Sequence, residues 1–229
     1  MRRAALVLIL TLAAAAPAGA ETIGHSVRGR AIRMTRVGAA DAPRKVLVVG
    51  CIHGSERAGI PITRALRHVA PPPGVQLLLV DRINPDGCAA GTRGNAHGVD
   101  LNRNFPAGWR PLRGVFFSGP RPSSEPETRA AQALILRERP DVTIWYHQHL
   151  DWVDLQRGGD QALMRRYARV AHMRATRTPT LPGTVTRWEN RVLPRASAFV
   201  VELPSGALPA RRVRAHVAAV LAVAAYQRS

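Results

Sequence analysis

Short apolar runs separated by turn residues recur along this chain and predict alternating strands and helices. Four compact runs predict strands, at residues 45–50, 75–80, 141–146 and 197–201. Apolar residues at helical spacing predict helices over 56–69, from 124 onward, over 161–174 and over 210–227. Strands that alternate with helices indicate an α/β sandwich with a mainly parallel sheet. We expect one domain, residues 21–229, which is long enough to bury a sizeable core.

Turn residues mark the boundaries between these elements. The Asn84-Pro85-Asp86-Gly87 sequence predicts a turn after the second strand, within a loop-rich stretch from 84 to 122. Ser124, with Glu127 three residues later, predicts a capping box at the start of a helix.

Polar residues follow the ends of the predicted strands, where chemistry gathers in α/β folds. His53 and Glu56 come just after the first strand, three residues apart across a turn. An imidazole and a carboxylate so placed can converge on one ion. Two histidines and one glutamate form a known catalytic zinc set that leaves a position for water. We therefore expect one Zn²⁺ per chain at this edge.

The third ligand is expected at the end of the third strand, in Tyr146-His147-Gln148-His149. If the strand continues, both histidines face the same side, and if it ends at Tyr146, His147 sits on the edge. We favour His147 as the ligand. His149 is the alternative, with a role as a supporting or cavity-lining residue if His147 binds the metal.

The loop between these strands offers cations. Arg103, with the neighbouring Asn102, could grip a substrate carboxylate through paired hydrogen bonds, as a peptidase that binds a free C-terminus requires. Arg93 could stabilise the oxyanion that forms when water attacks a carbonyl. In a chain so rich in arginine, solvated surface positions are the alternative for both.

Glu202 ends the fourth apolar strand, where a carboxylate needs a partner or a task. Beside zinc it could take a proton from water and pass it to a leaving amine. The alternative is an ion pair with one of the many arginines.

The first twenty residues have the three-part layout of a secretory signal peptide: a positive start, an apolar run from Ala4 to Ala16, and Ala18-Gly19-Ala20 as a cleavage site. The apolar run is short for a membrane anchor. We expect export to the periplasm or beyond the cell, and no integral membrane segment after cleavage.

The chain is strongly basic, with 33 Lys and Arg against 15 Asp and Glu. Lys45 is the only lysine, which favours codon bias as the cause, although affinity for an anionic cell wall remains open. No nucleic-acid motif is present, so we expect no nucleic-acid partner. In an oxidising compartment Cys51 and Cys88 form either a disulfide or a pair of buried thiols.

Five motifs in one order, HGSE, NPDG, GTRGNAHGVDLNRNFP, the YH strand end and VELP, resemble the zinc carboxypeptidases of the carboxypeptidase A type. The resemblance covers roughly residues 44–206. It implies a mixed, mainly parallel sheet flanked by helices on both faces. The compact length and the Ser118-Gly119-Pro120 and 124–129 stretches resemble the bacterial murein peptide amidases within that family.

The resemblance also implies roles for individual residues. The zinc ligands would be His53, Glu56 and His147. Arg93 would polarise the scissile carbonyl, Asn102 and Arg103 would bind the terminal carboxylate, and Glu202 would be the general base and acid. Asp100 would orient His53. The digestive members carry a tyrosine about twenty residues before the catalytic glutamate, and residues 177–182 contain none, so we assign no tyrosine role.

We therefore expect a zinc hydrolase that acts on a peptide with a free C-terminal carboxylate. The expected bond is the γ-D-glutamyl-diaminopimelate amide of cell-wall peptides. Two other functions stay open: a deacylase of the succinylglutamate desuccinylase and aspartoacylase group, and a non-catalytic cell-wall-binding protein.

Overall fold

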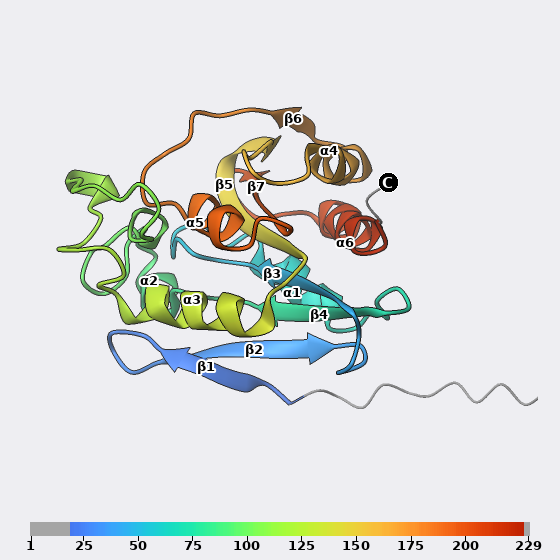
Figure 1. Cartoon of the computed structure of the whole chain (residues 1–229), viewed down its shortest axis with the longest axis horizontal. Helices are drawn as coiled ribbons and strands as arrows, with labels where there is room; N and C mark the ends of the chain where they lie inside the picture. The colour runs from blue at the N-terminus through green and yellow to red at the C-terminus, as the bar shows by residue number, and fades with distance from the viewer. Residues whose placement is uncertain (1–18, 227–229) are drawn as a thin grey trace, which may run out of the picture.

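The computed structural model describes residues 19–226, which form one seven-stranded mixed sheet with helices on both faces (Figure 1). The strands are β1 Glu21–His25, β2 Ala31–Val37, β3 Arg44–Val49, β4 Val75–Val80, β5 Val142–Asp154, β6 Arg174–Thr176 and β7 Ser197–Pro204. The α-helices are α1 Ile60–Leu66, α2 Pro85–Ala90, α3 Pro126–Glu138, α4 Gln161–Val170, α5 Val185–Val192 and α6 Ala210–Ala224. Two short 3₁₀ helices, η1 Leu101–Arg103 and η2 Gly114–Phe116, lie in the long loop. The signal peptide expected in residues 1–20 falls almost entirely outside the described residues.

The sheet has the order β1-β2-β4-β3-β5-β6, with β7 paired to β5. β1 and β2 run antiparallel to their neighbours, whereas β3 is parallel to both β4 and β5. The expected mixed, mainly parallel sheet is confirmed. One core lies between the sheet and α1, α4 and α6, and a second lies between the opposite face and α3 and α5. No helix in the described part of the chain is long and apolar enough to span a membrane.

The strand β5 is longer than expected and changes direction beside β7. From Val142 to His149 it pairs with β7 in increasing order, so that His147 lies opposite Glu202. The register shifts after His149, and the pairing then runs back, with Trp152 opposite Glu202 and Val153 opposite Val201. The second half of β5 is thereby placed near the residues that end β7.

Two expectations about local structure were wrong. The Asn84 sequence begins helix α2 instead of forming only a turn, because Asn84 Oδ1 accepts a hydrogen bond from Gly87 N (2.8 Å) and Pro85 fits the first helical position. The capping box at Ser124 is absent, since α3 has no side-chain cap at its start. Glu127 instead accepts hydrogen bonds from Val27 N and Asn95 Nδ2.

Candidate metal centre and substrate cavity

His53 and Glu56 lie in the loop that leaves β3, and the loop folds so that both side chains face one point. Glu56 N donates to His53 O (2.9 Å), which closes the turn between them. His53 Nδ1 and Glu56 Oε1 are then 3.0 Å apart, and the His53 side chain is buried. Gly54 allows this loop to lie against α2, because a Cβ at that position would be 1.9 Å from the carbonyl carbon of Gly87.

His147 on β5 completes the group. Its Nδ1 is 3.0 Å from Glu56 Oε2 and 3.1 Å from His53 Nδ1. In the described part of the chain these three residues form the one group of His, Cys, Asp and Glu side chains with metal-binding spacing. Tetrahedral zinc bonds of about 2.0–2.1 Å place ligand atoms about 3.3 Å apart, so the donor set and its spacing fit zinc. His149 lies outside the group and is exposed at the cavity wall.

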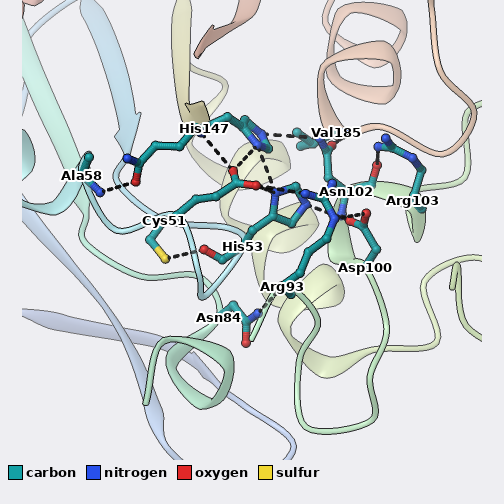
Figure 2. Close-up of polar contacts among 12 residues, drawn as sticks. Cys51, His53, Ala58, Asn84, Arg93, Asp100, Asn102, Arg103, His147 and Val185 are labelled. Carbon is teal, nitrogen blue, oxygen red and sulfur yellow. Dashed lines mark hydrogen bonds and ion pairs between the residues drawn. The ribbon is translucent and has the colours of Figure 1, made fainter. Parts of the chain in front are cut away.

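Asp100 supports His53 from the opposite side of the ring. Asp100 Oδ1 is 2.8 Å from His53 Nε2, and because an ionised carboxylate only accepts, Nε2 carries the proton and Nδ1 keeps a free lone pair. Burial opposes ionisation of Asp100, but the hydrogen bond from His53 and the charges of Arg93 and Arg103 hold the pKa of that carboxyl well below its usual range. The structure thus brings Asp100 to the position expected for a residue that orients His53 (Figure 2).

Arg93 joins the metal group to this support. Its Nε donates to Asp100 Oδ2 and its Nη1 to Glu56 Oε1, both at 2.9 Å. The side chain is 30% exposed and lines the cavity. A cation held there by two carboxylates has little freedom to move, which suits the stabilisation of a developing negative charge.

Arg103 is a buried cation that contacts no charged side chain through an ion pair among the described residues. It is 6% exposed, and its Nη1 donates to the backbone oxygen of Asn102 (2.7 Å). Among the described residues no carboxylate forms an ion pair with it. Phe116 lies against it, with the ring centroid 5.3 Å from Arg103 Cζ and 5.5 Å from Arg93 Cζ. A buried guanidinium without an anion suits a carboxylate that comes with the substrate.

The Asn102 side chain ties η1 to its surroundings. Its Oδ1 accepts from Val185 N (3.0 Å), which fixes the amide orientation and turns Nδ2 toward His147 Nε2 at 3.4 Å. Asn102 therefore lines the cavity beside Arg103, as expected, and also links the loop to the start of α5.

Glu202 faces the same cavity from β7. Its Oε2 is buried and has no hydrogen-bond partner among the described residues. Burial raises the pKa of Glu202, and the negative charge of Glu56 adds to this, although His147 and His53 act in the opposite direction. An orphaned carboxylate oxygen beside a metal site is chemically suited to accept a proton from water.

The cavity holds about 360 Å³ and brings together seven of the eight expected site residues. Asp100, the eighth, stands behind His53. Other residues that line the cavity, including Phe116, Trp152 and Asp154, were not expected from the sequence. The residues in β5 were missed because the expected strand stopped at Tyr146. Cys51 and Cys88, which could form a disulfide or remain a pair of thiols, lie buried side by side.

Part of the chain is similar in sequence to known proteins. Residues 74–175 match the zinc carboxypeptidase family, a span that includes Arg93, Asp100, Asn102, Arg103 and His147. Murein peptide amidase A of Escherichia coli K12 is 34% identical over 153 residues, which are 60% of this chain and 62% of that protein. The chain therefore aligns with about three fifths of the length of this curated relative.

Solved structures share the whole fold. The murein-tripeptide amidase of E. coli O157 superimposes with a TM-score of 0.76 at 25% identity, over 93% of this chain and 94% of that one. Bovine thrombin-activatable fibrinolysis inhibitor gives a TM-score of 0.74 at 17% identity, over 90% and 88% of the two chains, which shows the same fold.

Proposed function

We propose that this chain, of which residues 74–175 match the zinc carboxypeptidase family, is a hydrolase that removes the C-terminal residue of a peptide. One observation carries this proposal. A metal-binding group, a buried unpaired cation and an orphaned carboxylate oxygen share a single cavity: His53 with Glu56 and His147, then Arg103, then Glu202.

His53 and His147 would hold the metal through Nδ1, and Glu56 through its carboxylate. Zinc bound there acts as a Lewis acid, which polarises a carbonyl and lowers the pKa of water. We propose one zinc per chain, since these residues make up one site.

The chain's own residues supply the remaining steps. Arg103, with Asn102 beside it, binds the terminal carboxylate and so places the last amide bond at the metal group. Arg93 donates hydrogen bonds to the carbonyl oxygen as negative charge develops there. Glu202 takes a proton from the attacking water and delivers it to the nitrogen of the leaving amine. The raised pKa of Glu202 suits it to both steps.

We propose that the bond cleaved is the γ-D-glutamyl-diaminopimelate amide of cell-wall peptides. The names of the murein peptide amidases that resemble this chain support it. A neighbouring pocket, which shares Gln156 and Thr180 with the cavity, carries Arg157, Arg187 and Arg191. These cations suit the second carboxylate of diaminopimelate. The signal-like residues 1–20 support a periplasmic or secreted location, where wall peptides are available.

The experiment is an assay of the purified, zinc-loaded protein with L-Ala-γ-D-Glu-diaminopimelate, with standard peptides and with N-succinylglutamate. We expect free diaminopimelate from the first substrate. Release of standard amino acids alone would contradict the cell-wall proposal and leave the peptidase intact. Turnover of N-succinylglutamate alone would favour the deacylase, and no turnover of any substrate would favour a non-catalytic binding protein.

A further inference from the structure

Asp154 is a buried carboxylate without a cation in a chain that has cations in excess. It is 6% exposed, at the end of β5. The described residues include two other buried aspartates, Asp86 and Asp100, and each bonds an arginine at 2.7–2.9 Å. No Lys, Arg or His side chain forms an ion pair with Asp154 in the described part of the chain. A buried charge without a partner is costly, so it is retained where it has a task.

The pairing of β5 with β7 places Asp154 on the wall of the substrate cavity. Trp152 lies opposite Glu202, and residues opposite each other across two strands point to the same face. Asp154 is two residues after Trp152, so it points to that face as well. Diagonal neighbours of this kind lie about 7–8 Å apart, within reach of long side chains. Asp154 and Glu202 indeed line the same cavity.

The hydrogen bonds to Asp154 hold it in place and leave its charge uncompensated. Its Oδ1 accepts from Thr178 N (3.1 Å), and its Oδ2 accepts from Thr178 Oγ1 and Gln156 Nε2. All three donors are neutral. An ionised carboxylate has about four acceptor positions, so one position remains open for a further donor.

The cavity thus presents two unpaired buried charges of opposite sign, Arg103 and Asp154. A C-terminal residue with a side-chain ammonium carries the complementary pair of charges. Building on the proposed function, we infer that Asp154 is the specificity residue that binds a side-chain ammonium on the residue released from the substrate. This requirement excludes neutral C-terminal residues as good substrates, and diaminopimelate satisfies it through its distal amine.

The test compares two substrates that differ only in that amine: L-Ala-γ-D-Glu linked to 2,6-diaminopimelate and the same peptide linked to 2-aminopimelate. For the wild-type protein we expect kcat/KM to be about 10- to 100-fold higher with diaminopimelate, as a charge-assisted hydrogen bond provides. In Asp154→Asn this ratio should fall to near unity, mainly through a rise in KM for diaminopimelate. Asp154→Glu, which keeps the charge, should restore part of the preference.

The matched control is Asp151→Asn, which removes the same charge from the same strand at a residue that pairs with Arg212 and does not line the cavity. It should keep the wild-type ratio. A wild-type ratio near unity, or a ratio unchanged in Asp154→Asn, would overturn the inference while both peptides are still cleaved. If neither peptide is cleaved by the wild type, the proposed function itself has failed. If Asp154→Asn does not fold, inhibition of the wild-type protein by free diaminopimelate and by free 2-aminopimelate provides the test. We expect stronger inhibition by diaminopimelate, and equal inhibition would overturn the inference.

Discussion

His147 and Glu202 lie directly opposite each other on the adjacent strands β5 and β7, so the third member of the metal group and the orphaned carboxylate point to the same face of the sheet. The backbone register alone therefore places the proposed metal ligand beside the proposed proton acceptor. Residues held on paired strands are placed more precisely than residues on loops, which suits a catalytic site.

The pairing predicts that metal binding and proton transfer can be separated. Glu202→Gln should retain about one zinc per chain, because Glu202 is outside the metal group, yet lose about 10²- to 10⁴-fold in kcat. Metal analysis and peptide kinetics on the same preparation check this. Near-normal turnover of the glutamine variant would remove Glu202 from its role.

The metal group predicts that substitution of His147 removes zinc and that substitution of His149 does not. His147→Ala should lose zinc, because it removes one of three donor atoms, and His53→Ala should do the same. His149→Ala, only two residues away, is the matched control and should keep its zinc. Mass-spectrometric metal analysis after dialysis measures the effect. Zinc loss from the His149 variant alone would reverse the assignment.

The position of Arg103 predicts that hydrolysis depends on a free C-terminal carboxylate on the substrate. The wild type should discriminate strongly against a peptide whose terminal carboxylate is amidated, since the buried guanidinium is then left without an anion. Arg103→Ala should raise KM for the free peptide and reduce this discrimination, at a cost of about 2–5 kcal/mol in kcat/KM. Arg187→Ala, an exposed arginine of the neighbouring pocket, should leave discrimination at the α-carboxylate intact. Equal discrimination in the wild type and Arg103→Ala would refute the assignment.

The burial of Glu189 predicts that the free energy of unfolding depends on pH, independently of the metal group. Burial raises its pKa from 4.5 to about 7, against hydrogen bonds from Thr143 and Trp145. The folded state therefore favours the protonated form. Its contribution is complete below pH 4.5 and is lost as the pH rises to about 7, which lowers the free energy of unfolding by roughly 3 kcal/mol.

Urea unfolding of the wild type and Glu189→Gln between pH 4.5 and 8 measures this contribution. The difference between the two proteins cancels the pH dependence that arises elsewhere. We expect the glutamine variant to gain relative stability as the pH rises. A difference that is constant with pH would mean that Glu189 is ionised throughout this range.

Much of the site could be predicted because its residues directly follow recognisable strand segments in the sequence. His53, Glu56 and Glu202 follow apolar strands, and the parallel arrangement brings such strand ends to one edge of the sheet. The choice of His147 over His149 depended on where the strand ends; in the structure His147 lies with His53 and Glu56, whereas His149 is exposed.

The parts that were missed depend on long-range pairing. The return of β5 along β7 places Asp154 on the wall of the cavity. No local pattern in residues 147–154 indicates that change of direction. Strands β1, β2 and β6 were also missed, although Ile32, Arg33 and Met34 alternate in burial as a strand at a sheet surface does. Helix α5 was missed because it is short and largely polar, and its buried Glu189 contradicts the usual apolar pattern.

The central claim is that this chain hydrolyses a C-terminal amide bond with a metal held by His53, Glu56 and His147. The most direct measurement is the rate of release of the C-terminal residue from L-Ala-γ-D-Glu-diaminopimelate by metal-free protein, before and after addition of one equivalent of zinc. We predict negligible release before addition and full activity after it, with no recovery in His147→Ala. Equal release with and without zinc, or none in either state, would contradict the account.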